Sequence, residues 1–537
     1  MIRISQIKLP YFQEQDEYGI LKNKISKKLK VSETEILSCH IVRKSVDGRE
    51  RPDIYFVYTV DVQLKNENKV NKNIIKGNVS KVIKKAYDYK PSKEPSQVGQ
   101  PVIVGMGPAG LFCGYFLAVN GYKPIIIERG KPVEQRINDV NKFWETGVLD
   151  TESNVQFGEG GAGTFSDGKL NTLVKDKSGR NGLVLDTFVK FGAKEDIRYI
   201  NKPHIGTDVL TDVVRNMRNA IIEAGGQVRF ETKLTDIVVK DNAVEAVLVN
   251  DSERINTDSL VLALGHSARD TFKLLNKKGL VMEPKSFAVG VRMEHPQEMI
   301  DMSMYGMRHE DSKDQILGAA DYKLTAQASN GRAVYSFCMC PGGFVVNASS
   351  EDGMTAVNGM SYSGRDSQNA NSAIIVSVTP EDFETDEPLA GVEFQRKLER
   401  AAFEQGKGKI PVQLFGDFRD NRVSEAFDQV NTVTKGQTAF GDINRILPRE
   451  LCDALKECIP VFGKSIKGFD REDAVLLAVE SRTSSPIRIV RDGTLQSNIK
   501  GIYPCGEGAG YAGGITSAAM DGIRVFEALT GGYNEIK

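Results

Sequence analysis

The residues whose types and spacing could do chemistry are concentrated in two glycine-rich segments, one near residue 105 and one near residue 510. In the first, Gly105, Gly107 and Gly110 form a G-x-G-x-x-G pattern. Such glycines permit a tight turn, let backbone N–H groups approach a pyrophosphate and let the following helix pack closely on a strand. Glu128 follows at the distance where a carboxylate can accept the hydrogen bonds of an adenosine ribose. This segment therefore predicts a dinucleotide site.

Short apolar segments flank these residues in the order that a dinucleotide fold needs. Val102–Val104 and Ile125–Ile127 are expected to be buried strands, with a helix between them from about 108 to 120. The helix N-terminus would offer N–H groups and the positive end of its dipole to phosphates. An ordinary βαβ unit with a glycine-rich turn is the alternative, and it leaves Glu128 unexplained.

The second segment narrows the choice of ligand. Gly506 and Glu507 follow a short apolar strand, and Gly513, Gly514 and Ile515 open a helix of small and apolar residues. An NAD site is built within one continuous domain, whereas an FAD site of this type recruits a distant strand and helix. There the acidic residue would bond the ribityl hydroxyls, and the helix amides would face the flavin. The two segments together predict non-covalent FAD; a glycine-rich loop before a plain surface helix is the alternative.

Residues 158–163 also read G-x-G-x-x-G, but no buried strand precedes them and no clear helix follows, so a second nucleotide fold is not expected. We expect Gly160, Gly161, Gly163 and Thr164 to lie along the pyrophosphate and the flavin, with a plain surface loop as the alternative. A dedicated NAD(P) domain is not expected. NAD(P)H bound without one, a donor protein or the substrate itself would reduce the flavin.

Cys338 and Cys340 lie two residues apart on an expected strand, where their side chains would share a face. They are the candidates for a catalytic role, as a redox dithiol or as a thiolate near the flavin. Two small core side chains are the favoured alternative, because the neighbouring sequence contains no His or Lys that would lower a thiol pKa. Arg482 and Arg488 could hold a carboxylate or the FAD phosphates, or form salt bridges. His266 is interpreted as structural rather than as substrate-facing.

The bulk composition is that of a globular protein of 537 residues, with 40% apolar and 26% charged residues. We find no apolar run of transmembrane length, no signal-peptide core and no metal-ligand pattern. The expected compartment is the cytoplasm, and the seven cysteines suit reduced thiols.

The charge is unevenly distributed along the chain. Residues 1–95 contain 20 Lys and Arg against 12 Asp and Glu, whereas the remainder contains 50 against 59, and the polar stretch 90–100 separates the two parts. A small basic α+β domain is expected at 1–95, with helices over 19–30 and 74–87. A solvated basic face or docking on the acidic remainder is favoured over contact with nucleic acid.

The predicted fold class is α/β, with a Rossmann-like dinucleotide-binding domain, the N-terminal α+β domain and an inserted β-rich α+β domain. The dinucleotide domain is expected at 96–284 and 476–537. The inserted domain, expected at 285–475, would cover the cofactor and the substrate.

Eight segments in order resemble a largely uncharacterised bacterial family of FAD-dependent dehydrogenases, within the two-dinucleotide-binding-domain flavoproteins. They are VGMGPAGLFCGYFLA…IIIERG, FGEGGAGTFSDGKL, LALGHSARDTF, FAVGVRMEHP, YSFCMCPGGFVV, NGMSYSGRDSQNANSA, VESRTSSPIRI and IYPCGEGAGYAGGITSAAMDGI. The resemblance covers nearly the whole chain and implies FAD binding and oxidoreductase activity, but no substrate.

The resemblance also implies positions for the cofactor. Around the ADP half it places Gly105, Gly107, Pro108, Ala109, Gly110, Glu128, Arg129 and Arg136. It places the backbone of Leu234 at the adenine and Gly265 near the pyrophosphate. At the ribityl chain and flavin it places Gly506, Glu507, Gly513, Gly514 and Ile515.

The expected function is hydride transfer between flavin N5 and an unidentified organic substrate. The alternative is a flavin-binding protein that acts as an RNA-modification or regulatory partner through its basic N-terminal domain. A small-molecule substrate and an electron-donor protein are the expected partners, without a membrane.

Overall fold

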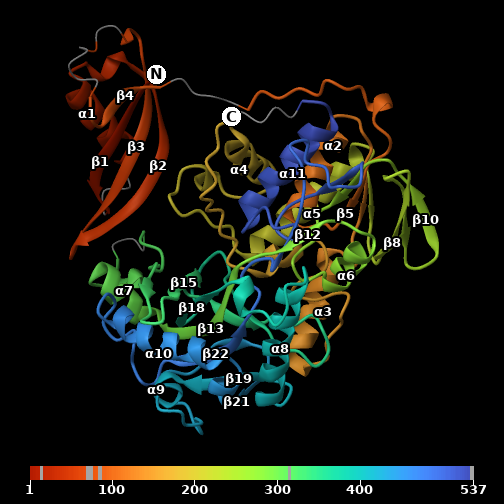
Figure 1. The fold of residues 1–537 in the computed structure, drawn as a ribbon. Helices are drawn as coiled ribbons and strands as arrows, with labels where there is room; N and C mark the ends of the chain where they lie inside the picture. Colours follow the sequence, from red (N-terminus) through yellow and green to blue (C-terminus); the bar gives the residue numbers. More distant parts are fainter. Residues whose placement is uncertain (12–15, 68–69, 71–75, 83–86, 313–315, 533–537) are drawn as a thin grey trace.

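The computed structural model describes residues 1–11, 16–67, 70, 76–82, 87–312 and 316–532. Figure 1 shows a small N-terminal sheet at one side, a layered α/β body that contains both α2 and the C-terminal helix α11, and a second large sheet beneath it. The chain passes through the α/β body, enters the second sheet and returns.

The N-terminal sheet has the strand order β2-β3-β1-β4. Its strands are β1 (Ile2–Pro10), β2 (Ile36–Glu50), β3 (Asp53–Leu64) and β4 (Val79–Lys81). Helix α1 (Glu17–Leu29) buries Leu21, Ile25 and Leu29 against them, at the spacing of one helix face.

The helix expected over 74–87 is wrong where the structure describes that segment. Val79 is buried and pairs with Ile4 in an antiparallel ladder, so β4 occupies the middle of the expected helix. Gly77 precedes it with φ of +59°, which favours glycine. Burial of Val79 in the sheet outweighs the weak helical pattern of the lysines around it. The remainder of this prediction, at 74–75 and 83–86, lies outside the described residues.

The α/β body is built on a parallel sheet with the order β24-β11-β5-β6-β7. Its strands are β5 (Val102–Val104), β6 (Ile125–Ile127), β7 (Gln227–Arg229), β11 (Leu260–Leu262) and β24 (Ile502–Pro504). Three helices, α2 (Pro108–Val119), α5 (Thr207–Glu223) and α11 (Ile515–Leu529), pack into the core on one face. Strand β24 pairs with β11, so the last part of the chain completes a sheet begun near residue 100.

A second hydrophobic core covers the other face of this sheet. It takes in α6 (Arg269–Lys277) and a three-stranded meander of β8 (Leu234–Lys240), β9 (Ala243–Val249) and β10 (Glu253–Asn256). The outer elements of this body are α3 (Val133–Thr146) and α4 (Arg180–Lys190). Strands β12 (Met282–Pro284) and β23 (Ile487–Ile489) pair where the chain leaves and rejoins it.

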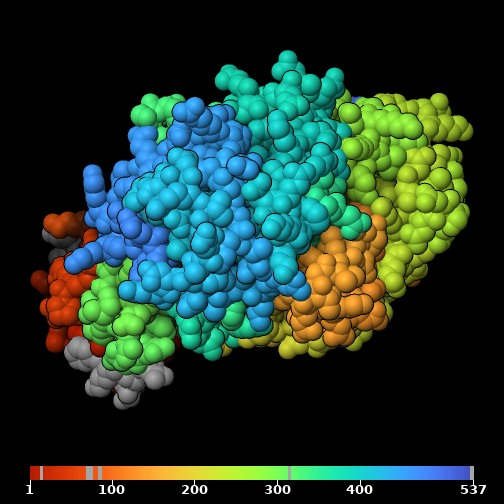
Figure 2. All heavy atoms as spheres, turned by 90° about the horizontal axis from the view of Figure 1, so that it is seen from below, coloured from red at the N-terminus to blue at the C-terminus, as the bar shows by residue number. Residues whose placement is uncertain are grey.

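The inserted part is a seven-stranded sheet with the order β14-β15-β18-β13-β22-β19-β21. Its strands are β13 (Phe287–Pro296), β14 (Thr325–Gln327), β15 (Ala333–Cys340), β18 (Asn369–Val378), β19 (Ile410–Leu414), β21 (Thr438–Phe440) and β22 (Val475–Glu480). A smaller sheet contains β16 (Phe344–Asn347), β17 (Val357–Met360) and β20 (Thr434–Lys435). The helices are α7 (Gln297–Tyr305), α8 (Ala390–Gln405), α9 (Phe415–Arg419) and α10 (Arg449–Gly463). In Figure 2 these cyan and blue segments cover most of the visible face, beside the orange α3.

Two glycines of α2, Gly110 and Gly114, differ in what surrounds them, and this difference gives a testable prediction. A Cβ on Gly110 would lie 2.0 Å from the carbonyl oxygen of Gly105, whereas a Cβ on Gly114 would lie 2.4 Å from the terminal methyl of Ile126. A side-chain end can rotate away, but the backbone of a tight turn cannot. We therefore expect Gly110→Ala to lower the free energy of unfolding by about 1–3 kcal/mol.

The matched control is Gly114→Ala, for which a helix-propensity gain of about 1 kcal/mol should offset most of the repacking. Urea-denaturation midpoints of the two variants measure the difference. Equal losses would contradict the assignment of Gly110 as the close-packing glycine.

Candidate active site

A cavity of about 370 Å³ lies between the α/β body and the inserted sheet, in the size range of cofactor sites. Residues at the carboxyl ends of β5, β6 and β11 line it, together with the first residues of α2 and α11. The inserted part contributes Phe337, Cys338, Asn358 and Glu480. The cavity therefore lies where ligands bind in open parallel sheets, and two helix N-termini point into it.

Glycine backbone forms much of the cavity wall. A Cβ on Gly161 would lie 3.0 Å from the Cα of Gly107, so the two glycine loops touch through their main chains. Among the described residues, no atom lies within 4 Å of a Cβ placed on Gly265, Gly513 or Gly514. Backbone of this kind, at two helix N-termini, fits the pyrophosphate and flavin of a dinucleotide such as FAD.

Glu128 holds the glycine loops together at the end of the cavity where the sequence predicts the adenosine. Its carboxylate accepts hydrogen bonds from the backbone N–H groups of Met106 (2.9 Å), Gly130 (3.0 Å) and Gly158 (2.9 Å). A carboxylate offers about four lone-pair sites. Glu128, which lines the cavity and is 5% exposed, thus has room for about one ribose hydrogen bond rather than the expected pair.

The two predicted arginines have different positions. Arg129 lines the cavity, with its guanidinium 4.1 Å from the ring centre of Phe157 and ion pairs to Glu152 and Asp270. Arg136 is fully buried outside the cavity lining and donates to backbone carbonyls. The acceptors are those of Asn154, Val155, Gly158, Glu159 and Gly161, at 2.6–3.3 Å. Arg136 therefore supports the loop that faces the ligand.

At the opposite end of the cavity, the carboxylate of Glu507 is hydrogen-bonded to other groups of the protein. It accepts from His266 through the backbone N–H (3.3 Å) and Nδ1 (2.8 Å), and from the backbone N–H of Ser485 (2.9 Å). Burial alone would raise the pKa of Glu507, but the neighbouring His266, through both of its hydrogen bonds, and Lys285 lower it. The carboxylate is held charged at the cavity wall, and His266 is its partner rather than an isolated structural histidine.

Most of the predicted cofactor residues line this one cavity. They are Gly105, Gly107, Pro108, Ala109, Glu128, Arg129, Gly161, Gly163, Leu234, Gly265, Glu507, Gly513, Gly514 and Ile515. The others lie behind the wall: Gly110, Arg136, Gly160, Thr164 and Gly506. Their backbones or side chains support the lining residues; Gly506, for example, packs on Ala109.

Several cavity residues were not identified from the sequence, notably Asp167, Lys169 and Asn358. Lys169 pairs with Asp167 at 3.1 Å and donates to the carbonyl oxygen of Met339. The polar run SDGKL after the glycine loop was the available signal.

The surroundings of the two cysteines differ from the expectation. Cys338 lines the cavity, whereas Cys340 is fully buried. Two cations from distant segments approach them: Lys169, and Arg292, whose Nη1 lies 3.8 Å from Cys340 Sγ and donates to Cys338 O at 2.9 Å. The expectation that no lysine lies near these thiols is therefore wrong, because local sequence does not reveal partners brought in by the fold.

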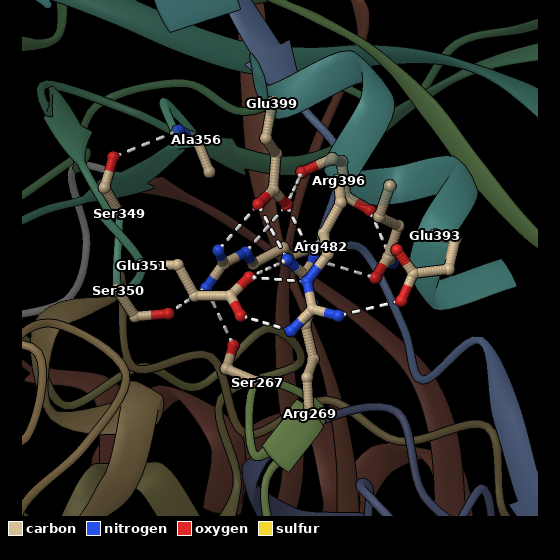
Figure 3. Close-up of polar contacts among 12 residues, drawn as sticks. Ser267, Arg269, Ser349, Ser350, Glu351, Ala356, Glu393, Arg396, Glu399 and Arg482 are labelled. Carbon is tan, nitrogen blue, oxygen red and sulfur yellow. Dashed lines mark hydrogen bonds and ion pairs between the residues drawn. The ribbon is translucent and has the colours of Figure 1, made fainter. Parts of the chain in front are cut away.

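A buried ion network joins the two large parts (Figure 3). Glu399 on α8 accepts from Arg269 Nη2 (2.7 Å) on α6 and from Arg482 Nε (2.9 Å) and Nη2 (2.8 Å). Arg482, which lines the cavity, also donates to Ser267 at 3.0 Å. Burial alone would raise the pKa of Glu399, but the two arginines lower it well below its ordinary value.

A parallel sheet with two glycine-lined helix N-termini at one cavity, covered by an inserted sheet, defines a dinucleotide-binding flavoprotein fold. A family model described as "FAD-dependent protein, C-terminal domain-like" matches residues 286–483, and a model described as a domain of unknown function matches residues 1–63. An uncharacterised protein of Clostridium beijerinckii is 48% identical over 533 residues, which cover 98% of each chain. The chain belongs to this family of FAD-dependent proteins; it is an FAD-dependent oxidoreductase, and FAD is its cofactor.

Solved structures show more distant likeness. A mutant of the E. coli quinol fumarate reductase FrdA is 13% identical, with a TM-score of 0.36, over 81% of this chain and 72% of that one. L-proline dehydrogenase from P. horikoshii is 13% identical, with a TM-score of 0.33, over 83% of this chain and 96% of that one.

Within the described residues, we find no helix with the length and apolar character needed to cross a bilayer.

The ion network predicts a large effect for Glu399→Gln. Removing one charge from a buried pair leaves its partners uncompensated and costs about 3–5 kcal/mol. We expect a matching fall in the free energy of unfolding and faster proteolysis between α8 and the α/β body.

Glu384→Gln is the control, because Glu384 pairs with Lys397 while both side chains are more than 70% exposed. Such a pair contributes less than about 1 kcal/mol. Comparable losses in the two variants would show that the buried network does not hold the two parts together.

Proposed function

We propose that this oxidoreductase transfers a hydride between flavin N5 and an organic substrate held beneath the inserted sheet. One observation carries the proposal. The glycine-rich loops around Gly107 and Gly513 line the same cavity as residues of the inserted part, which include Phe337, Asn358 and Glu480. FAD, when bound, supplies the hydride acceptor or donor, while the protein positions the reactants and tunes their charges.

The chain would bind FAD at both ends of the cavity. The N-terminus of α2 and the main chains of Gly107 and Gly161 suit the pyrophosphate. The N-terminus of α11, opened by Gly513 and Gly514, would direct its positive end toward the flavin. A positive helix end favours negative charge, such as that of the reduced cofactor.

Glu480 is the group best placed to hold a proton on the substrate side. It lines the cavity at the end of β22, and its carboxyl accepts from Arg292 Nε at 2.8 Å. Burial raises the pKa of Glu480, and Arg292 offsets that only in part. A substrate that gains or loses a proton with the hydride would exchange it at this carboxyl.

The electron donor and the compartment complete the proposal. NAD(P)H bound without a domain of its own, a donor protein or the substrate would supply electrons. Cytoplasmic location is favoured because the cysteines in the structure are unpaired. The comparisons give no support to the alternative of an RNA-modification partner.

Glu507→Gln tests the cofactor site. The substitution removes the charge that His266 faces and weakens a charge-assisted hydrogen bond, a loss of about 1–3 kcal/mol. We expect FAD to bind about ten- to a hundredfold more weakly, with the far-UV circular dichroism unchanged. Titration of the apoprotein with FAD, followed by flavin fluorescence, measures this, and Glu384→Gln serves again as the control. Unchanged affinity would exclude Glu507 from the site.

Anaerobic mixing of the holoprotein with NADH, NADPH and a panel of small metabolites tests the reaction. A substrate or donor bleaches the flavin absorbance in a stopped-flow instrument. Purified protein that is colourless and takes up no FAD would overturn the proposal.

A further inference from the structure

The cysteine pair at the cavity wall has a geometry that the proposed hydride transfer does not use. In the ladder between β15 and β18, the register shifts between Phe337 and Cys340, which marks a bulge in β15. Cys338 lies in this bulge with φ of +43°, a conformation uncommon for a residue with a side chain. Strained residues of this kind cluster at functional sites.

The bulge brings the two sulfurs within reach of each other. Residues two apart on an extended strand are about 6.5 Å apart, and a disulfide joins Cα atoms that are about 4.4–6.8 Å apart. A bend shortens the extended distance. Cys340 Sγ already donates to the carbonyl oxygen of Cys338 at 3.3 Å.

The cations around the pair stabilise a negative sulfur. Arg292 is fully buried and contacts Cys340 Sγ, and Lys169 lies on the cavity side. The hydrogen bond from Cys340 lowers the pKa of Cys338, and despite its burial Lys169 and Arg292 lower it further. The pKa of Cys340 is raised, first by its interaction with Cys338 and then by burial, so Cys338 is the sulfur that carries the negative charge when the pair loses a proton.

We propose that Cys338 and Cys340 are a redox pair that exchanges two electrons with the FAD, an inference that rests on the proposed function because it needs the flavin in this cavity. Cys338 faces the ligand, while Cys340 lies behind it as the resolving sulfur.

The electron exchange requires only the two cysteines and the FAD. A bond forms between Cys338 Sγ and Cys340 Sγ, and the S–H bond of Cys340 breaks. The two electrons and the single proton pass to oxidised FAD and give the anionic reduced cofactor. In reverse, reduced FAD opens the disulfide. The external reductant in this proposal is a small thiol compound: its sulfur attacks Cys338 Sγ, the S–S bond breaks, and Cys340 leaves and takes up the proton of the thiol. A second thiol then attacks the mixed disulfide, which frees Cys338 and releases the oxidised compound as its own disulfide.

Counting thiols tests the pair without any enzymatic assay. The protein is treated with diamide, denatured, alkylated and weighed by intact mass spectrometry. We expect five of the seven cysteines to be alkylated after oxidation and all seven after reduction. Cys338→Ser and Cys340→Ser should show no protected pair, whereas Cys39→Ser, in the N-terminal sheet, should still lose two sites.

Electron counting in the holoprotein tests the link to the flavin. Anaerobic dithionite titration of the oxidised wild type should consume about four electrons per FAD, whereas Cys338→Ser and Cys340→Ser should each consume about two. Dithiothreitol should bleach the flavin of the wild type but not that of Cys338→Ser.

Other results would separate the two proposals. Full alkylation after oxidation, or a wild type that takes up only two electrons, would overturn the redox pair and leave the flavin function intact. A protein that binds no FAD would overturn the proposed function and with it the electron exchange, whatever the thiol count.

Discussion

A carboxylate buried between two arginines connects the parts of this structure that must act together. Glu399 comes from the inserted sheet's helix α8, Arg269 from the α/β body and Arg482 from the segment that joins them. Separating these charges within a dry interface would leave each uncompensated, so the interface has a strong preference for one arrangement. Because Arg482 also reaches Ser267 at the cavity wall, this arrangement sets the shape of the space beside the cofactor.

The cavity depends on contacts between segments far apart in the chain. Strand β24 and helix α11 belong to the same body as β5 and α2, although the whole inserted part lies between them in the chain. Bringing the cavity residues near Gly107 and those near Gly513 together therefore costs the loop-closure entropy of a long intervening segment. A cofactor that touches both ends binds the completed fold and stabilises it by mass action.

Sequence patterns predicted the elements that position the site. Buried triplets such as Val102–Val104, the glycine spacing and the small-residue helix after Gly514 each have a local cause, so their structures followed from local rules. Local rules did not reveal that Glu128 is engaged by three backbone N–H groups, or that Arg136 supports a loop from behind. They also missed Lys169 and Arg292 beside the cysteines, because these neighbours arise only from tertiary folding.

The N-terminal sheet contacts both large parts of the molecule through β2 and its own core. Lys44 on β2 exchanges backbone hydrogen bonds with the segment around Tyr199 and Asn201, which belongs to the α/β body. On the same strand, Gly48 lies so close to α7 that a Cβ would be 2.7 Å from the carbonyl oxygen of Met304, and Leu317 of the inserted part enters the N-terminal core. This small domain therefore connects the α/β body with the inserted part. Any motion that separates these two parts and widens the cavity for exchange of substrate must move the N-terminal domain as well, or break its contacts with one of them.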